Sequence, residues 1–563
     1  MTIFRAVSVA FLFIIFSGTT SVFAQQPICP APEFVTRADI RGIGLAEVTR
    51  DDIDVSVYGY AEYPIACVTE DTVFEAASLT KPVVAYLVMR LVDQGRLGLD
   101  DSLIELLPSL PLPEGDPRSG RVTIRMALAH STGLEGPDNA ELRFVSEPGE
   151  TFSYYPAGYR LVQRIIEDLE GDTLEAIAQR EVFVPLGMTS SSLVFREDLL
   201  PRIATRHRIL GDAFQRDRDP EQPANAAASM VTSTGDYGRF LNAMLGGDGL
   251  TDLSRDAMLT PQIDVPETDG AVAWGIGWGL EPARGTFWHY GDDGAAKCFT
   301  IGSTEQGRAI VYFTGSTSGL SIAGEMAERL IPGESPAVEW LGYDEWDAPR
   351  RLARRDTLRA FVEGDDELGM QTLIGYGERN PDLDLDNLAR YLTWVLDNRG
   401  VHEGRARLLA WRIERAPDNV DLYLDRARSL KEMGDFEAAI QTLRDAQTLA
   451  DENLSSVVAA QLAWLVDEAE AARNAGSEPE HASSALEGTY GTWRVFTEDG
   501  ALLFQPGQGN RYSLRWMLGT TYALEELDWF RLRFVIDGGV ATKVIGMYSD
   551  GRTAENERVS EPD

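Results

Sequence analysis

The chain is poor in residues that cross-link a fold or bind metals. Among its 563 residues there are three cysteines, Cys29, Cys67 and Cys298, so at most one intramolecular disulfide forms and no disulfide framework exists. Its five histidines are scattered along the chain without the spacing of zinc ligands. We therefore expect neither a metal ion nor a cofactor.

Positive charge is also scarce. The chain has 51 Lys and Arg residues against 89 Asp and Glu residues, which gives a formal net charge of −38. A surface of this sign repels polyanions, which argues against nucleic acid and acidic membrane surfaces as partners. After the N-terminus, no segment reaches about 18 uncharged apolar residues, so we expect no stable membrane span once the N-terminal segment is removed.

Residues 1–24 have the pattern of a secretory signal peptide. Arg5 precedes an apolar run from Ala6 to Phe16, and the small residue Ala24 favours cleavage before Gln25. The alternative is an N-terminal membrane anchor, but the apolar run is too short to span a bilayer comfortably. We expect export, so that the protein is periplasmic or secreted.

Length and composition predict several domains, because a chain of 563 residues is too long for one hydrophobic core. After the signal peptide we expect a first domain at 33–335, a helical region at 350–475 and a small β-domain at 484–555. A Pro- and Gly-containing stretch at 332–336 is typical of a linker after the first domain.

The motif with most chemical content is Ser78-Leu79-Thr80-Lys81. Residues three apart share one face of a helix, so the Lys81 amine can reach and activate the Ser78 hydroxyl as a nucleophile. Pro82 is tolerated only in a first helical turn, and the apolar pattern continues to a stop at Gly95. Ser78 is therefore predicted at the N-terminal end of a helix, where developing negative charge is stabilised.

The lysine at position 81 supports this interpretation, because the chain has only four lysines and otherwise uses arginine. A desolvated lysine can lose its proton and act as a base, whereas arginine effectively cannot. The alternative is a chance Ser-x-x-Lys on a solvated helix, since a four-residue pattern alone is a weak signal.

Two further motifs follow in the chain. Tyr154 precedes an apolar helical pattern from Leu161 to Leu169, and His289 begins His-Tyr-Gly-Asp between two strand-like segments. With these motifs the chain resembles the serine hydrolases related to class C β-lactamases and penicillin-binding proteins, whose signatures are Ser-x-x-Lys, Tyr-x-Asn and Lys-Thr-Gly or His-x-Gly. The resemblance covers roughly residues 33 to 335, with supporting matches at 130–134, 185–188 and 226–241.

The resemblance implies a mixed α/β (α+β) fold, an antiparallel sheet flanked by helices, with a helical cluster holding Tyr154. It also implies that Ser78 carries the acyl group, while Lys81 and Tyr154 share its proton. Which of the two is the base stays open, although an adjacent ammonium would lower the pKa of Tyr154.

The same resemblance places His289 on an edge strand facing the substrate, within the motif that contains Gly291. The backbone N–H groups of Ser78 and Asp292 would then form the oxyanion hole.

Each of these residues also has a purely structural interpretation. Tyr154 next to Tyr155 is, without the family pattern, more typical of aromatic packing. His289 beside a tryptophan is compatible with a half-buried strand histidine. We interpret His130 as structural and Lys297 as a residue on the surface or rim of the site.

One position departs from the family pattern. Pro156 stands where relatives usually carry the Asn of Tyr-x-Asn, and proline offers neither a side-chain amide nor a backbone N–H. A β-lactam or peptide has an amide that this Asn would normally bind. With His289 in place of lysine, the site favours esterase or peptidase action over β-lactamase action.

The C-terminal part shows two patterns. Gly400 and Gly434 are 34 residues apart, the tetratricopeptide period, and the second unit resembles that repeat better than the first. Two such units make little of a binding groove, so we favour a structural arm over a peptide-binding array. The alternating segment 530–534 and several Asp-Gly turns predict the small β-domain, which resembles β-barrel-like domains appended to related hydrolases.

Two functions follow from these observations. The first is an exported serine hydrolase that forms an acyl-enzyme on Ser78 with a small-molecule or peptide ester or amide. The second is a catalytically weak or inactive relative that acts as a binding or scaffold protein, with a protein partner bound through the helical repeats. An α/β-hydrolase is excluded because the chain contains no Gly-x-Ser-x-Gly.

Overall fold

The computed structural model describes residues 27–136, 142–211, 213–214, 218–474 and 479–559. The chain divides into two compact units, Met1–Asp347 and Ala348–Asp563. The predicted signal peptide at 1–24 lies outside the described residues.

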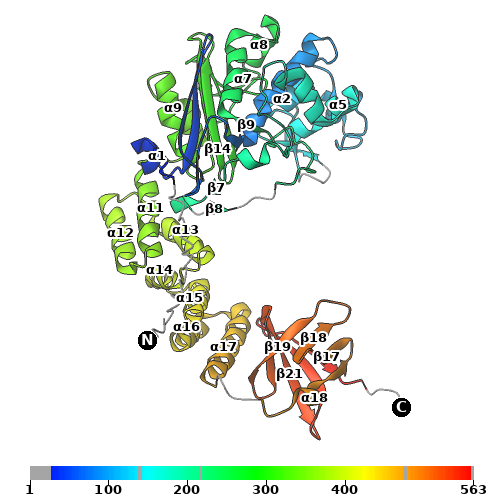
Figure 1. Cartoon of the computed structure of the whole chain (residues 1–563), viewed down its shortest axis with the longest axis vertical. Coiled ribbons are helices and arrows are strands. Elements are labelled where there is room, and N and C mark those ends of the chain that lie inside the picture. Colours follow the sequence, from blue (N-terminus) through cyan, green and yellow to red (C-terminus); the bar gives the residue numbers. More distant parts are fainter. Residues whose placement is uncertain (1–26, 137–141, 212, 215–217, 475–478, 560–563) are drawn as a thin grey trace, which may run out of the picture. The chain divides into compact units, whose positions relative to one another are not determined.

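The first unit is built on a nine-stranded antiparallel sheet (Figure 1). The first strands of the chain lie beside the last strand of the unit, because β1 pairs with both β2 and β15. In spatial order the strands are β10 (Ile263–Asp264), β11 (Ala273–Trp274), β12 (Gly279–Glu281), β13 (Thr286–Asp293), β14 (Ala296–Ser303), β15 (Arg308–Thr314), β1 (Gly42–Thr49), β2 (Ile53–Glu62) and β3 (Ala66–Cys67).

Side chains on both faces of this sheet are buried. Along β15, Ile310 and Tyr312 belong to one hydrophobic core, while Val311 and Phe313 belong to the other. Successive side chains of a strand point to opposite faces, so an unbroken apolar strand requires helices on both sides.

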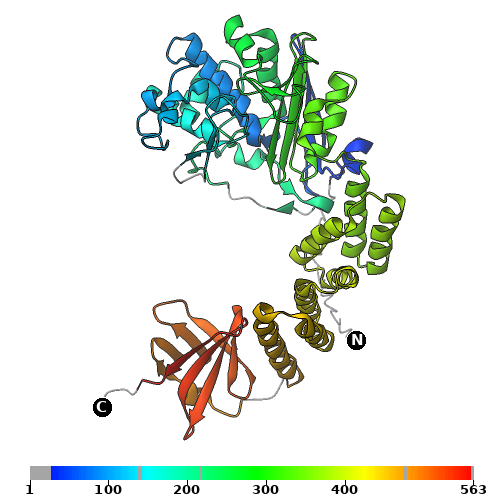
Figure 2. The same cartoon turned by 180° about the vertical axis from the view of Figure 1, so that it is seen from behind.

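Helices cover each face (Figures 1 and 2). One core takes residues from α2 (Thr80–Asp93), α5 (Ala157–Glu170) and α7 (Thr234–Gly246), and the other takes residues from α1 (Glu33–Arg37), α9 (Ala323–Leu330) and α10 (Pro336–Leu341). The remaining helices and short strand pairs of the unit are α3 (Leu103–Leu106), α4 (Ile124–Leu128), α6 (Leu174–Ala178), α8 (Asp252–Met258), β4 (Val73–Glu75) with β9 (Val231–Ser233), β5 (Leu134–Glu135) with β6 (Arg143–Phe144), and β7 (Arg206–His207) with β8 (Ala213–Phe214).

The second unit begins with helices that pack as successive pairs. Each of the first three pairs has a glycine with a positive φ in its connection, Gly364, Gly400 and Gly434, so one glycine-linked helix pair precedes the two that the sequence indicated. The helices are α11 (Pro349–Val362), α12 (Asp366–Arg379), α13 (Leu385–Asn398), α14 (His402–Arg415), α15 (Val420–Glu432), α16 (Phe436–Leu449) and α17 (Glu452–Arg473). Their assignment as tetratricopeptide repeats stays a prediction. No described helix is both long and apolar enough to cross a membrane.

The unit ends in an eight-stranded antiparallel sheet in sequence order, preceded by α18 (Ser483–Leu486). Its first and last strands meet, because the Gly491 N–H donates to Glu557 O at 3.1 Å and the Val559 N–H donates to Thr489 O at 2.8 Å. The sheet therefore closes into a small barrel. Its strands are β16 (Gly488–Tyr490), β17 (Trp493–Glu498), β18 (Ala501–Pro506), β19 (Tyr512–Leu518), β20 (Thr521–Leu524), β21 (Leu527–Asp537), β22 (Val540–Tyr548) and β23 (Thr553–Glu557).

The predicted fold class is confirmed: an antiparallel sheet with flanking helices, a helical arm and a small all-β domain. Two details refine the sequence interpretation. Cys29 and Cys67 form a disulfide, while Cys298 is a buried free thiol. In β21, Arg531 is 2% exposed because its guanidinium stacks on Trp464 of α17, 3.5 Å from the ring centroid, so the alternation there is not between core and solvent.

Glu281 ties the sheet to α10, beyond the predicted linker. Its buried carboxylate accepts hydrogen bonds from the Ser335 and Thr286 hydroxyls, the Ala337 N–H at 3.0 Å and Arg284 at 3.0 Å. Buried Ser335 caps α10, and the residues up to 347 belong to the first unit rather than to a linker.

We expect Glu281→Ala to lower the free energy of unfolding of the first unit by about 3 kcal/mol, because it leaves a buried guanidinium and several donors without their acceptor. Glu33→Ala, which removes an exposed ion pair with Arg37, is the control and should change stability by less than about 0.5 kcal/mol. Urea unfolding followed by tryptophan fluorescence measures both. Equal urea midpoints for the two variants would contradict the stabilising role assigned to Glu281.

Candidate active site

Ser78 lies at an abrupt turn between β4 and α2. Ala77 has φ +45°, a left-handed conformation that is strained for a residue with a Cβ. Two hydrogen bonds hold this turn: Ala76 N–H donates to Met230 O at 2.8 Å, and Thr80 Oγ1 donates to Ala77 O at 2.6 Å. Ser78 is therefore presented at the start of the helix by a backbone that its surroundings keep in place.

The predicted contact between the lysine and the serine is present. Lys81 Nζ donates to Ser78 Oγ at 2.9 Å and to Ala227 O at 2.8 Å, and the side chain is buried. Among the described residues Lys81 forms no ion pair. Burial, and to a smaller extent the charge of Arg160, lower the pKa of Lys81 to about 7.

Tyr154 lies beside the amine just ahead of α5. Its ring centroid is 5.0 Å from Lys81 Nζ, and its buried hydroxyl makes no hydrogen bond to the described residues. Burial raises the pKa of Tyr154 well above its ordinary value, and the nearby Ser78 hydroxyl opposes this rise only in part. The expectation that Lys81 would lower this pKa is wrong, because desolvation of the phenolate outweighs it.

His130 holds the chain segment that carries Tyr154. Its carbonyl accepts from the Ser153 N–H at 2.8 Å, its Nδ1 lies 3.2 Å from both the nitrogen and the carbonyl oxygen of Tyr155, and its ring lies 4.4 Å from the Tyr154 ring centroid. Burial lowers the pKa of His130 well below its ordinary value, so the ring stays neutral.

The predicted substrate strand is β13, and its position corrects one expectation. β13 is not an edge strand, because β12 and β14 lie on either side of it. However, β12 is only three residues long and its last partner is Trp288, so from His289 onward this side of β13 has no partner strand in the described part of the chain. A short neighbour thus leaves a local edge within an interior strand.

His289 and Gly291 point to the same face of β13, toward Ser78. A Cβ at Gly291 would lie 2.6 Å from Ala76 O and 3.2 Å from Ala77 Cβ, so only glycine permits this approach. His289 Nδ1 lies 2.8 Å from Tyr290 O, and its buried Nε2 has no hydrogen-bond partner among the described residues. Burial, then the charge of Lys81, lower the pKa of His289 to about 3.

The Asp292 side chain makes contacts of its own, away from Ser78. Lys297 forms an ion pair with this carboxylate and the Tyr343 hydroxyl donates to it. The interpretation of Lys297 as a surface or rim residue is wrong, because it is 8% exposed and lies opposite Asp292 in the β13–β14 ladder. Cross-strand pairing, which a five-residue separation in the sequence does not reveal, buries it.

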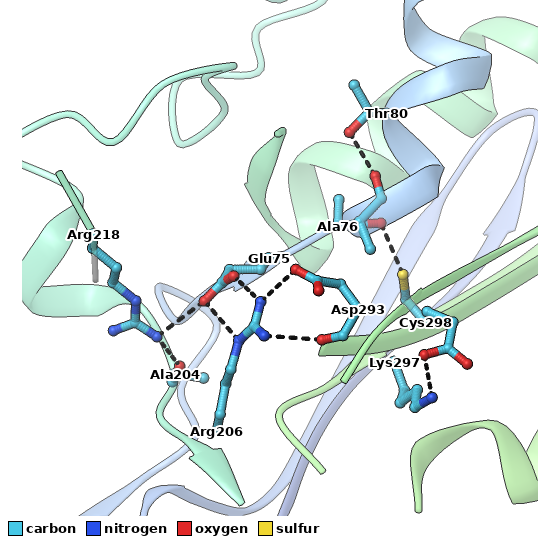
Figure 3. Close-up of polar contacts among 11 residues, drawn as sticks. Glu75, Ala76, Thr80, Ala204, Arg206, Arg218, Asp293, Lys297 and Cys298 are labelled. Carbon is cyan, nitrogen blue, oxygen red and sulfur yellow. Dashed lines mark hydrogen bonds and ion pairs between the residues drawn. The ribbon is translucent and has the colours of Figure 1, made fainter. Parts of the chain in front are cut away.

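Three residues around the site escaped the sequence interpretation. Ala227 supplies a carbonyl to Lys81, Thr80 links the Ser78 turn to Met230, and Arg206 binds Glu75 and Asp293 on either side of the turn (Figure 3). Thr80 and Ala227 lie in segments that the family resemblance had marked, whereas Arg206 does not. No group of three or more described His, Cys, Asp or Glu side chains is placed to hold a metal ion.

Comparisons with known proteins show what the chain is similar to. The model of the family "Beta-lactamase" matches residues 31–331, more than half of the chain. Penicillin-binding protein 4 of Amycolatopsis lactamdurans is 32% identical over 265 residues, 41% of this chain and 68% of that protein. The lovastatin esterase of Penicillium rubens is 27% identical over 219 residues, 32% of this chain and 52% of that protein.

Among solved structures, the β-lactamase/D-alanine carboxypeptidase from Pseudomonas syringae matches 53% of this chain and 95% of its own, with a TM-score of 0.46 and 18% identity.

The buried amine predicts a pH dependence. We expect the rate of acylation of Ser78 by an activated ester to rise between about pH 5 and about pH 9, with a midpoint near 7, because Lys81 accepts a proton only after losing its own. Stopped-flow release of p-nitrophenol in pre-steady-state experiments measures this rate. Lys81→Arg, which cannot lose its proton, should lower the rate about 10²–10⁴-fold across the range. A pH-independent rate would contradict the role of Lys81.

Proposed function

Because the chain belongs to the Beta-lactamase family, we propose that it is a serine hydrolase that forms an acyl-enzyme on Ser78. The observation that carries this proposal is the hydrogen bond from the Lys81 amine to the Ser78 hydroxyl at 2.9 Å. This amine is buried and forms no ion pair with the described residues. A chance Ser-x-x-Lys on a solvated helix would have neither the burial nor the lowered pKa.

In the proposed mechanism Lys81 is the general base. Near neutral pH a substantial fraction of the amine is unprotonated and removes the Ser78 proton as Oγ attacks the carbonyl carbon. Tyr154 stays protonated because its pKa is raised, so it can donate a proton to the departing alkoxide. In deacylation, water attacks the acyl carbon and returns a proton to Tyr154, and Lys81 returns its proton to Ser78.

The proposed oxyanion hole consists of the backbone N–H groups of Ser78 and Asp292. Support comes from the close approach of Gly291 to Ala76 and Ala77, which brings the two chain segments side by side. Ser78 also lies in the short helical turn Ala77–Leu79, directly before α2, whose N-cap is Leu79. N–H groups at the start of a helix have no intrahelical acceptor. Each such donor contributes roughly 3 to 4 kcal/mol to stabilisation of the tetrahedral intermediate.

The proposed substrate is an ester without a carboxylate close to the reacting carbonyl. Lys297, which could attract such a group, is paired with Asp292, and His289 is neutral because its pKa is about 3. Pro156 begins α5 and offers no amide to bind an acylamino group. The name of the lovastatin esterase relative is consistent with ester substrates, while the penicillin-binding relatives keep peptides as the alternative.

We propose export to the periplasm or beyond from the N-terminal sequence pattern, and a structural role for the helical arm. A second function as a binding protein would rest on this arm. It becomes the preferred function only when Ser78 proves unreactive.

A first experiment tests the nucleophile. We expect a fluorophosphonate probe to add to the Ser78 peptide of the wild type and not to Ser78→Ala, and p-nitrophenyl butyrate turnover to fall to background in that variant. Ser153→Ala removes an exposed hydroxyl beside Tyr154 and should keep both properties. Peptide mass spectrometry locates the adduct. A folded wild type without adduct or turnover would favour the binding function.

A second experiment tests the substrate class. We expect kcat/KM for p-nitrophenyl butyrate to exceed that for a penicillin, and Pro156→Asn to raise the penicillin value about tenfold by supplying one hydrogen bond to the amide. The ester value serves as the control, since an ester without an amide gains nothing from the new side chain. If the wild type hydrolysed the penicillin as fast as the ester, the proposed preference for ester substrates would be contradicted.

A further inference from the structure

Arg206 connects the chain segment of Glu75 with that of Asp293 (Figure 3). Its Nε donates to Glu75 Oε1 at 3.3 Å, and its Nη2 donates to the other carboxylate oxygen of Glu75. On its other side, Nη1 donates to the Asp293 carbonyl at 2.9 Å and Nη2 donates to Asp293 Oδ2 at 2.9 Å. One guanidinium therefore binds two carboxylates and one backbone carbonyl.

The two segments are those that carry the proposed oxyanion donors. Glu75 is the last residue of β4, three residues before Ser78, and Asp293 directly follows Asp292 at the end of β13. Glu75, Ala77 and Asp293 also line one small cavity together with Met230. The distance between the Ser78 and Asp292 N–H groups thus depends on how β4 and the end of β13 are held together.

Two further contacts hold the Ser78 turn against β13 and β14, but neither replaces the guanidinium. The Cys298 thiol donates to Ala76 O at 3.0 Å, and Gly291 approaches Ala76 and Ala77. Both contacts lie on the side of these segments that faces the core of the sheet. From Asp292 onward β13 leads into a two-residue turn to β14, and Arg206 is the side chain that binds the Asp293 carbonyl there.

These ion pairs fix the positions of the two chain segments more than they stabilise the fold. The side chains of Arg206 and Glu75 are 7% and 8% exposed, and Arg218 adds a second cation at Glu75 Oε1, 3.2 Å away, while also donating to Ala204 O. Desolvation offsets much of the attraction in such buried pairs, so they contribute little net stability. Arginine presents several donors in a rigid plane, which lysine or an apolar side chain cannot reproduce.

We propose that Arg206 is a positioning residue for the oxyanion hole: it holds the chain segments of Ser78 and Asp292 at the separation that binds the tetrahedral intermediate. The inference rests on the proposed function of Ser78. Arg206 does not touch the substrate. It acts through Glu75 and Asp293, and its effect should appear in the transition state more than in substrate binding.

The test compares Arg206→Met with the wild type in the hydrolysis of p-nitrophenyl butyrate. We expect kcat to fall about 100-fold while KM changes less than about threefold, because a displaced oxyanion donor weakens only the transition state. The affinity for a tetrahedral phosphonate analogue of the ester should fall in parallel with kcat/KM. Arg206→Lys should remain impaired, because a single ammonium cannot bind Glu75 and Asp293 in the same plane.

Arg284→Met is the matched control. Arg284 has a side chain 13% exposed that also binds a buried carboxylate, Glu281, and a carbonyl, Ile331 O, but it lies at the β12–β13 turn, away from Ser78. We expect a loss of thermal stability similar to that of Arg206→Met with kcat unchanged. Asp293→Ala, at a side chain 45% exposed, is a milder variant of the same network and should lower kcat about three- to tenfold even if Arg206→Met fails to fold.

The outcomes separate the two proposals. A wild type that is neither labelled at Ser78 nor active would overturn the proposed function, and this inference with it. An active wild type with unchanged kcat in Arg206→Met, or in Asp293→Ala where Arg206→Met does not fold, would overturn this inference alone. So would equal losses of kcat in Arg206→Met and Arg284→Met, since a general loss of stability would then account for both.

Discussion

The burial of the Lys81 amine is the constraint on which the site depends. The amine lies in the core between α2 and the sheet, with a carbonyl, a hydroxyl and aromatic rings around it and no ion pair among the described residues. A protonated amine is poorly solvated there, so the neutral form becomes accessible near pH 7. A carboxylate in contact with Lys81 would have stabilised the charge and removed the base. The surroundings of Lys81 are therefore part of its chemistry.

A second constraint is the close packing of backbone on backbone. The left-handed Ala77 and the absence of a side chain at Gly291 allow the turn that presents Ser78 to lie directly against β13. His130 places the segment 153–155 by three separate contacts, one to each residue. The nucleophile and the amine thus come from one part of the chain and the phenol from another, and each part is held by its own set of hydrogen bonds. Such a site tolerates little displacement of any one part.

Charge around the site is largely compensated within the protein. Asp292 binds Lys297, and Arg206 binds Glu75 and Asp293, so these groups serve the structure rather than a charged ligand. Three neutral polar atoms near Lys81, His130 Nε2, Tyr154 Oη and His289 Nε2, are buried without hydrogen-bond partners among the described residues. Buried polar groups are usually hydrogen-bonded, so ordered water is the natural complement of these three atoms.

Much of the fold and of the candidate site could be predicted from the sequence. Spacing on a helix placed Lys81 within reach of Ser78, and alternation and turn residues indicated the strands of the β-domain, because these patterns are set by local backbone geometry. Local patterns could not show that β12 is too short to cover His289, that Lys297 is buried opposite Asp292, or that burial raises the pKa of Tyr154. Those properties depend on which segments become neighbours.

The sequence by itself determined the chemical groups of the site, their order and the helix that joins Ser78 to Lys81. Tertiary structure alone decided their protonation and their alignment. Desolvation arises only when distant segments exclude water, and Arg206, 131 residues from Glu75 and 87 from Asp293, binds both only because the folded chain brings them together.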